Sequence, residues 1–353
     1  MNSLESLFKQ VLTIGPSPGA RGGIASVIQT YSGQLPAFCN LPTNSVRGTA
    51  AGAFVLAGAM LRMPFHRLRG RRILHVHSAS GKSFIRKAML ISWGRLLGYK
   101  IIFHAHSGGF ADYVDKVGAD RVERVLKKCD AEIVLSERWR EYFTDKFGCS
   151  DVTVLPNMVV PPVRYTPARQ RSSDEPLRLL FLGKICRDKG VYDLIKALAH
   201  PDLRGKVHLT VGGNDEVEQF LQAARDAGVG DAVEYVGWVS GEKKDKLLTD
   251  TDILVLPSYI EAMPITVLEA MAYGRAVISS RAGALPELVA DGVTGFLAEA
   301  GDVEALTAAI RRHVADPTLA PAQGRAARER VTPYLPASVT EALAAIYSRV
   351  LEK

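Results

Sequence analysis

Two glutamates and two prolines stand in the stretch LVLPSYIEAMPITVLEAMAYGRAVISS, residues 254–280. An apolar strand is expected to end at Pro257, and Glu261 follows in a loop. Pro264 suits the first turn of a helix, where its missing N–H would be unpaired anyway. Free amides at a helix N-terminus bind anions, and Glu269 could accept paired hydrogen bonds from two ribose hydroxyls. Either glutamate alone is better explained as a cap or a solvated residue, but the whole string predicts a phosphate and sugar site.

Three cations crowd a turn in FLGKICRDKG, residues 181–190. Gly183 permits a tight turn after a strand, and Lys184, Arg187 and Lys189 follow. These charges repel one another unless an anion shares the site, and a diphosphate is the natural candidate because lysine serves as a point charge for it. A solvated basic turn explains this segment equally well when it is taken alone.

A glycine-rich loop follows the first expected strand. Gly15, Gly19, Gly22 and Gly23 precede an expected helix, so the backbone could approach a ligand closely there. The spacing is not the G-x-G-x-x-G dinucleotide pattern, and such a loop alone indicates little.

Two histidine pairs also stand at strand ends. Alternate strand residues face the same way, so His75 with His77, or His104 with His106, could grip a metal. No third ligand stands at a suggestive spacing, so a metal is the weaker interpretation. His106 is instead expected to hydrogen-bond in a cleft, and His75 and His77 are interpreted as structural.

Short apolar runs alternate with amphipathic segments along the chain, which indicates parallel sheets covered by helices on both faces. Ligands of such sheets bind beyond the carboxyl ends of the strands. The predicted class is α/β, with two Rossmann-like doubly wound parallel-sheet domains facing across a cleft. We expect an N-terminal domain over 1–160, a proline-rich linker over 161–176, a C-terminal domain over 177–335, and a helix over 336–353 that packs back on the first domain. Strands are predicted at 10–14, 73–76, 101–105, 132–135, 152–155, 177–182, 207–211, 233–236, 253–256, 276–279 and 295–297.

Composition excludes several classes of protein. With 47% hydrophobic and 23% charged residues the chain is not largely disordered. It shows no secretory pattern and no apolar run of the roughly 20 residues that span a bilayer, so a cytoplasmic protein is expected. The net charge is +7, with basic residues interleaved with apolar ones over 60–72 and 84–100. Such segments suit an acidic membrane surface or a phosphorylated substrate, or are solvated faces; no motif indicates nucleic-acid binding.

Metal-binding and redox chemistry are not expected. The four cysteines are scattered, which indicates reduced structural thiols. Asp250, Thr251 and Asp252 form a D-x-D sequence, but it falls where a helix is expected to lead into a buried strand, so we interpret it as a junction.

These motifs resemble retaining glycosyltransferases of family 4, which have the GT-B fold. The specific ones are GKICRDKG and the E-x7-E string EAMPITVLE with AMAYGRAVI; RGGIASVI, FHAHSGG, VTVLPN and AGALPELVADGVTGFL add to the resemblance in the same order. Two departures are Ala262, where the family most often has glycine, and Lys184, where arginine is common.

The resemblance implies roles for individual residues. Lys184 and Lys189 would hold the donor diphosphate, Glu269 the ribose, and Glu261 would lie by the donor sugar. His106 would contact that sugar, so the catalytic set is His106, Lys184, Lys189 and Glu261. The remaining donor-binding residues would be Gly22, Gly23, Gly183, Val239 beside the nucleobase, and Met263, Pro264, Ile265 and Thr266 through their backbone.

The implied activity is retaining, metal-independent transfer of a sugar from a UDP- or GDP-sugar to a saccharide or polyprenyl-diphosphate-linked acceptor in polysaccharide biosynthesis. No cofactor is expected beyond the nucleotide sugar. The first domain would contact the acceptor, and its basic segments would meet the acidic inner face of the cell membrane. A sugar-nucleotide epimerase or phosphorylase on the same fold, or a non-catalytic sugar-nucleotide-binding protein, are the alternatives.

Overall fold

The computed structural model describes residues 3–17, 20–43 and 49–353 and divides into two compact units. Unit 1 comprises residues 1–158 and 336–353, and unit 2 comprises residues 159–335. Within the described residues each unit contains a six-stranded sheet, and every strand pairing is parallel. The predicted pair of doubly wound α/β domains is confirmed.

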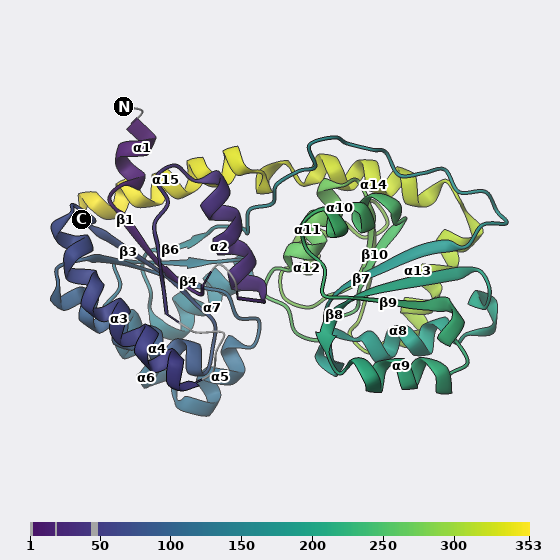
Figure 1. Ribbon diagram of the computed structural model, residues 1–353, viewed down its shortest axis with the longest axis horizontal. Coiled ribbons are helices and arrows are strands. Elements are labelled where there is room, and N and C mark those ends of the chain that lie inside the picture. The colour runs from purple at the N-terminus through teal and green to yellow at the C-terminus, as the bar shows by residue number, and fades with distance from the viewer. Residues whose placement is uncertain (1–2, 18–19, 44–48) are drawn as a thin grey trace. The chain divides into compact units, whose positions relative to one another are not determined.

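Unit 1 places its strands in the order β2-β1-β3-β4-β5-β6. Strands β1, β3 and β5 are buried along their whole length, as expected for a parallel sheet covered on both faces. Helices cover both faces of this sheet, with α3, α4 and α6 on one side and α2 and α15 on the other (Figure 1). The elements are β1 (Val11–Gly15), β2 (Asn40–Pro42), β3 (Ile73–Ser78), β4 (Lys100–Ala105), β5 (Ala131–Val134), β6 (Val152–Val154), α1 (Ser3–Phe8), α2 (Gly23–Gln34), α3 (Thr49–Leu68), α4 (Lys82–Leu96), α5 (Phe110–Val117), α6 (Ala119–Leu126), α7 (Glu137–Phe147) and α15 (Pro336–Glu352).

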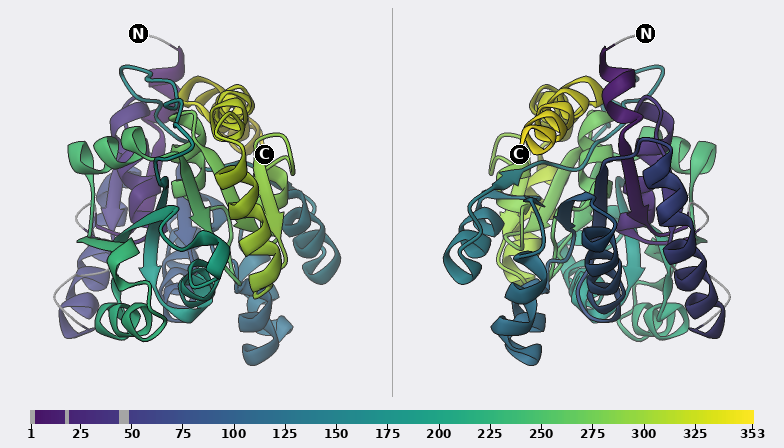
Figure 2. Two further views of the ribbon diagram at one scale, coloured as in Figure 1. Left: turned by 90° about the vertical axis from the view of Figure 1, so that its right-hand side faces the viewer. Right: turned by 90° about the vertical axis from the view of Figure 1, so that its left-hand side faces the viewer.

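Helix α15 completes unit 1 although it is the last element of the chain. It lies beside α1, as Figures 1 and 2 both show, and it also packs on β3. Tyr347 of α15 is buried and its ring meets Phe8 edge to face. The hydroxyl of Tyr347 hydrogen-bonds His75 Nδ1 at 2.8 Å, which fixes the helix to the central sheet.

Unit 2 orders its strands β12-β11-β10-β7-β8-β9. Residues 161–176, where a linker is expected, form no helix or strand and lie within this unit. The unit begins and ends at one place, because the N–H of Val159 donates to the carbonyl of Tyr334 at 2.9 Å. The elements are β7 (Leu177–Ile185), β8 (Val207–Asp215), β9 (Val233–Gly237), β10 (Ile253–Leu256), β11 (Ala276–Ser280), β12 (Gly295–Ala298), α8 (Val191–Leu198), α9 (Val217–Asp226), α10 (Gly241–Asp250), α11 (Ile265–Ala272), α12 (Leu285–Leu288), α13 (Val303–Ala315), α14 (Leu319–Arg330) and the short 3-10 helices η1 (Arg187–Lys189), η2 (Pro201–Leu203), η3 (Gly230–Ala232) and η4 (Thr332–Tyr334).

Each sheet has one switch point, where the strand order reverses. In unit 1 the switch point lies between β1 and β3, because β2 is added on one side of this pair and β4 to β6 on the other. In unit 2 it lies between β7 and β10, with β8 and β9 on one side and β11 and β12 on the other. Ligands of doubly wound sheets bind beyond the carboxyl ends of the strands at such a point. The loops after these four strands are therefore where a site is expected on topological grounds.

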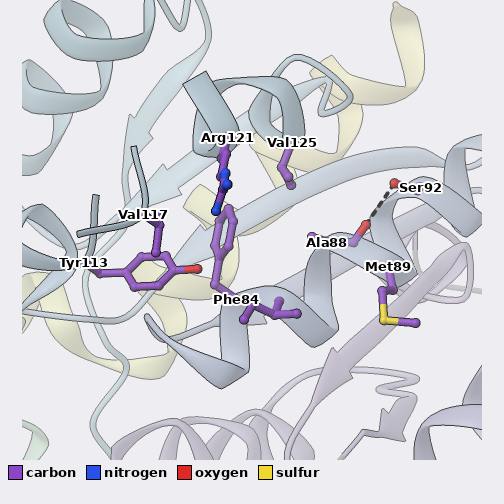
Figure 3. A pocket seen from close by; sticks show the side chains of 9 residues that line it. Phe84, Ala88, Met89, Ser92, Tyr113, Val117, Arg121 and Val125 are labelled. Carbon is purple, nitrogen blue, oxygen red and sulfur yellow. Dashed lines mark hydrogen bonds between the residues drawn. The ribbon is translucent and has the colours of Figure 1, made fainter. Parts of the chain in front are cut away.

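The surface of unit 1 carries apolar side chains near α4. A groove of about 500 Å³ lies between α4, α5 and α6 (Figure 3). In this view Arg121 points toward the ring of Phe84, and Ser92 donates a 3.0 Å hydrogen bond to the carbonyl of Ala88 within α4. Among the described residues, no helix combines the length and apolar content needed to cross a bilayer.

Candidate active site

Lys189 and Glu261 meet at the switch point of unit 2. Lys189 ends η1, directly after β7, and Glu261 lies in the loop after β10. The ammonium of Lys189 contacts Glu261 Oε1 at 2.5 Å, and the same oxygen accepts a 2.9 Å hydrogen bond from Ser258 Oγ. Only 24% of the lysine side chain and 9% of the glutamate side chain are exposed. The two charges are held in a fixed, largely desolvated pair.

Gly190 brings the two loops of this switch point together. Its φ is +66°, and a Cβ at this position would lie 2.1 Å from the carbonyl oxygen of Pro257. Only glycine therefore permits the loop after β7 to touch the loop after β10. A backbone hydrogen bond from Tyr259 N to Asp188 O, at 2.8 Å, holds the same contact.

Helix α11 begins beside Glu261 and directs its free amides out of its first turn. Met263 and Pro264 are buried and lead into the helix, in which Leu268 N makes the first bond, to Pro264 O, at 3.4 Å. The amides of Ile265 and Thr266 precede that bond, so they are among those that a helix leaves without an internal acceptor. This positive end of the helix is suited to an anion.

Lys184 does not join Lys189 but pairs with a carboxylate on the neighbouring strand. The parallel register sets Lys184 opposite Asn214 and Gly183 opposite Gly213, so Asp215 lies within reach. The ammonium of Lys184 contacts Asp215 Oδ2 at 2.9 Å, and both side chains are largely exposed. This carboxylate raises the pKa of Lys184, which keeps the lysine charged.

Glu269 is the fifth residue of α11 and faces α10. Lys244 of α10 forms an ion pair with it, and both side chains are mostly buried. Burial raises the pKa of Glu269, while the charge and hydrogen bond of Lys244 act in the opposite direction. Val239, in the loop before α10, lies against Gly212 of β8. The residues expected at the ribose and the base therefore follow β10 and β9 of one sheet, with β7 and β8 between these strands.

In unit 1 the glycine loop leads into helix α2. Gly22 has φ +126°, which favours glycine, and it stands directly before the first residue of the helix, Gly23. A Cβ at either position would meet no described atom within 4 Å, so the space beside this backbone is open. Gly19, which belongs to the same predicted loop, lies outside the described residues.

His106 belongs to a cluster of four histidines rather than to a separate pair. Its Nε2 lies 2.8 Å from His77 Nδ1, and His75 Nε2 lies 3.1 Å from His104 Nδ1. Burial lowers the pKa of His106 and of His75 to about 3, and it lowers the pKa of the other two well below the usual value. All four imidazoles are therefore neutral at physiological pH.

This cluster corrects one expectation from the sequence. No third ligand was expected near either pair, but His75, His77 and His104 offer nitrogens within 4.8 Å of one another. The reason is the register of β3 and β4, which sets His77 beside His104. Nε2 of His77 and Nε2 of His104 are buried and have no hydrogen-bond partner among the described residues. The geometry could accept a metal, and the expectation of a metal-free site stays a prediction.

The D-x-D sequence forms the junction between α10 and β10, as interpreted from the sequence. Asp252 is buried and bonds Arg169 Nε at 3.0 Å and the amide of Arg178 at 2.9 Å. Its carboxylate is occupied by a structural ion pair. Asp250 lies at the end of α10 and uses its carbonyl to accept from Arg178.

Sequence reasoning missed the partners of the predicted residues. Asp215, Lys244 and Ser258 each contact one of them. Asp215 and Lys244 lie outside every motif, and Ser258 lies within the stretch 254–280 but was given no role. Asp215 shows the clearest structural signal, a φ of 101° that is rare for a residue other than glycine. Knowledge that β7 pairs with β8 would have predicted its contact with Lys184, because the end of β8 must adjoin the end of β7.

Comparison with known proteins agrees with this geometry. Residues 165–330, which include the whole of the site in unit 2, match the family described as glycosyl transferases group 1. Glycogen synthase of Mycobacterium tuberculosis is 34% identical over 215 residues, which cover 59% of this chain and 51% of that protein. The chain thus spans about half the length of the first curated relatives it matches. A GDP-mannose-dependent alpha-(1-6)-phosphatidylinositol monomannoside mannosyltransferase of Mycolicibacterium smegmatis is 28% identical, with 90% of this chain and 92% of that protein covered.

Solved structures resemble the chain over nearly its whole length. Sucrose-phosphate synthase from Thermosynechococcus elongatus has a TM-score of 0.77 at 20% identity, covering 97% of this chain and 99% of that one. Anabaena Alr3699/HepE in complex with UDP-glucose has a TM-score of 0.76 at 16% identity, covering 96% and 99%. These likenesses confirm the two-domain α/β fold.

Proposed function

We propose that this protein transfers a sugar from a nucleotide-sugar donor to a saccharide or lipid-linked saccharide acceptor in glycan biosynthesis, because residues 165–330 match the family described as glycosyl transferases group 1. The observation that carries the proposal is the meeting of Lys189, Glu261 and the start of α11 at the switch point of unit 2. A cation and a helix N-terminus at one place suit a diphosphate leaving group. A carboxylate beside them suits the hydroxyls of the sugar that it carries.

Each site residue has a role in this proposal. Lys184 and Lys189 stabilise the charge that the diphosphate gains as it leaves, and the backbone from Met263 to Thr266 contacts sugar and phosphate. Glu269 binds the ribose hydroxyls, for which Lys244 keeps it ionised, and Val239 lies by the base. Among residues of unit 1, the amides of Gly22 and Gly23 bind phosphate and neutral His106 hydrogen-bonds the sugar.

The proposed reaction retains the anomeric configuration. The acceptor hydroxyl attacks the sugar's anomeric carbon from the face that the diphosphate leaves, its proton passes to an oxygen of the departing phosphate, and the nucleoside diphosphate is released. Positioning and electrostatic stabilisation of the leaving group are then the work of the protein. The reaction needs no metal in this scheme, because the lysines and the helix N-terminus supply the positive charge.

The donor is proposed to be a UDP- or GDP-sugar. A related enzyme is named as GDP-mannose-dependent, and a structural neighbour holds UDP-glucose. A thermal-shift panel of UDP-, GDP-, ADP- and dTDP-sugars tests this, followed by Lys189→Ala and Glu269→Ala with the best binder. We expect both variants to lose the shift and Lys206→Ala, at an exposed lysine of the same unit, to keep it. Equal shifts in all proteins would mean that the site is misplaced.

Incubation with the donor alone separates transfer from the alternatives. A transferase hydrolyses its donor slowly, whereas an epimerase converts it to another nucleotide sugar. Activity should survive dialysis against a chelator; loss of activity that only a divalent cation restores would contradict the metal-free scheme.

The proposal has a more specific part, which is that the acceptor is bound to a membrane. The surface of α3 exposes Phe54, Leu61, Phe65 and Leu68 together with basic residues such as Arg62, a combination that suits an acidic lipid surface. Such contact would place the enzyme on the inner face of the cell membrane. The apolar groove beside α4 has a size suited to a lipid chain.

Co-sedimentation with vesicles containing phosphatidylglycerol tests the membrane contact. We expect binding at low salt that weakens in the double variant Phe65→Ser, Leu68→Ser. Val293→Ser removes an exposed apolar side chain of unit 2 and should leave binding unchanged. No binding at low salt would count against the contact.

A further inference from the structure

A small basic pocket occupies the switch point of unit 1. Its volume is about 260 Å³, and it opens between the loop after β1, the end of β3 and the start of α4. None of the described residues lining it is acidic. Those that matter here are Gly22, Thr43, His77, Ser83, Arg86 and Lys87.

Lys87 is buried in this pocket without a counter-charge. Only 3% of the residue is exposed, and no carboxylate of the described residues lies within ion-pair distance of it. Its ammonium donates to Thr43 Oγ1, whose own hydrogen is directed to Gly15 O at 3.1 Å. An ammonium has three hydrogens to donate, so one hydroxyl does not satisfy it. Burial and the charge of Arg86 lower the pKa of Lys87 to about 7.

Two more buried polar atoms of the pocket lack partners. Nε2 of His77 and Nε of Arg86 make no hydrogen bond to the described residues. His77 is fully buried, and its other nitrogen is engaged by His106 at 2.8 Å. Buried polar groups are normally paired, so these atoms indicate a ligand that the protein itself does not supply.

The start of α2 adds backbone amides to the same pocket. Gly22 and Gly23 line it, and the first bond of the helix runs from Ser26 N to Gly22 O at 3.1 Å. Amides before that bond are directed outward, as phosphate-binding helix ends require. The volume lies below the roughly 300 Å³ at which pockets for drug-sized ligands begin, so it suits a phosphate group rather than a whole nucleotide sugar.

We propose that this pocket binds the phosphate or diphosphate group of a phosphorylated acceptor, with Lys87, Arg86 and His77 as its ligands. The proposal rests on the proposed function and names the class of its acceptor. The switch point of unit 2 has its own cations and helix end for the donor diphosphate. The amides of Gly22 and Gly23 remain assigned to the donor phosphate, and the side chains of Lys87, Arg86 and His77, which line the same pocket, are assigned to the second anion.

Titration calorimetry with inorganic pyrophosphate tests the pocket. The starting protein carries Lys189→Ala, so that the donor site of unit 2 contributes little. We expect it to bind pyrophosphate and to bind it about tenfold or more weakly after Lys87→Met. Lys82→Met removes an exposed lysine of the same helix and should leave binding unchanged. Equal binding after Lys87→Met, or no binding by the starting protein, would overturn the proposal.

Lys87→Met should fold, because methionine keeps the length of the side chain and removes an uncompensated buried charge. Thermal unfolding checks this. If Lys87→Met does not fold, Arg86→Gln, at a half-buried position, is used for the same binding test. Competition then separates the sources of the phosphate. Displacement of pyrophosphate by farnesyl diphosphate indicates a lipid acceptor, and displacement by glucose 1-phosphate a soluble one; displacement by neither contradicts the proposal.

Binding of UDP and GDP distinguishes this proposal from the proposed function. Lys87→Met alone should leave nucleotide binding unchanged, whereas Lys189→Ala should abolish it. If Lys87→Met removed nucleotide binding as fully as Lys189→Ala, the pocket would hold the donor diphosphate and the acceptor assignment would be wrong. If the unaltered protein bound pyrophosphate at Lys87 but no nucleotide, the donor proposal alone would fail.

Discussion

The two switch points of this protein handle charge in opposite ways. In unit 2 every lysine named at the site faces a carboxylate, with Lys189 beside Glu261 and Lys184 beside Asp215. In unit 1 the buried Lys87 faces a hydroxyl, and the neighbouring histidines are neutral. Both arrangements place cations beyond strand ends, but only one supplies their counter-charges.

The difference predicts different responses to a ligand. A diphosphate entering unit 2 competes with carboxylates that already stabilise the lysines, so part of its attraction is offset by the pairs that it weakens. An anion entering unit 1 meets a buried lysine with no opposite charge beside it, and it would raise the pKa of this lysine from about 7, because electrostatic attraction is least screened there. The lysines of unit 2 would therefore exchange a carboxylate for a phosphate, whereas Lys87 of unit 1 would gain an opposite charge where it had none.

The largest expected effect comes from removing the paired lysine of unit 2. Lys189→Met should lower kcat by about a thousandfold, because a charge acting on the leaving group in a dry site contributes several kcal/mol to the transition state. Steady-state kinetics with the best donor measure this. Lys206→Met removes an exposed lysine of the same unit and should leave kcat unchanged. A similar kcat for both variants would break the assignment of unit 2 as the donor site.

A smaller effect is expected at the ribose. Glu269→Gln should weaken binding of UDP or GDP by about ten- to a hundredfold, since hydrogen bonds to a charged carboxylate are replaced by weaker ones. Calorimetry measures the affinity, with Glu242→Gln on the exposed start of α10 as the control. Pyrophosphate binding should not change. A variant that loses pyrophosphate as well would mean that Glu269 acts on the phosphates.

The role of Lys244 can be tested through the pH dependence of nucleotide binding. Burial raises the pKa of Glu269 and Lys244 opposes this, so Lys244→Met should raise that pKa further. Ribose binding requires the ionised form, and affinity for the nucleotide should therefore be lost at a higher pH in the variant than in the unaltered protein as the pH is lowered. The same pH dependence in the two proteins would show that Lys244 does not control the charge of Glu269.

A last effect, on stability rather than on binding or rate, concerns a buried acid of unit 1. Burial, aided by the charge of Asp151, raises the pKa of Glu132 on β5 from 4.5 to about 8. The folded state holds this proton while the unfolded state releases it, so the contribution of Glu132 to the free energy of unfolding falls as pH rises from about 4.5 to 8.

Glu132→Gln carries no such proton. Relative to the unaltered protein it should gain roughly 3 kcal/mol in the free energy of unfolding between pH 5 and pH 8. Urea titrations at both pH values measure the difference, and Glu137→Gln, at an exposed start of α7, should show none. If the free energies of unfolding of Glu132→Gln and the unaltered protein differed by the same amount at both pH values, the Glu132 carboxyl would already be ionised in the folded state.

The sequence predicted the strands and the turns after them, because buried parallel strands are nearly continuous apolar runs. The strand expected at 253–256 is β10, and that expected at 10–14 is shifted by one residue from β1. The helix α14 was not predicted, since its sequence LAPAQGRAARER buries small and polar residues such as Gln323 and Gly324 instead of an apolar stripe. The short β2, with Pro42 as its last residue, gave no strand signal either.

The candidate site was predictable where one segment supplies it, and not where two segments meet. Glu261 and Lys189 lie in separate motifs that the resemblance joins, but Asp215 and Lys244 lie outside every motif. The histidine cluster depends on which strands are neighbours and on their register, and neither is fixed by the spacing of residues within one strand. Lys87 was seen only as one charge of a basic segment, because burial of a lysine leaves no mark in the local pattern.

The hydrogen bond between Val159 and Tyr334 has a consequence for how the protein is made and how it could be rebuilt. In the sequence, unit 2 is inserted between residues 158 and 336 of unit 1. The hydrogen bond joins the two ends of this inserted unit. During synthesis unit 2 can fold as soon as it emerges, whereas unit 1 waits for α15, whose Tyr347 completes its core. The same hydrogen bond makes the stretch from 159 to 335 suitable for exchange between related proteins, because both junctions of unit 2 lie close together.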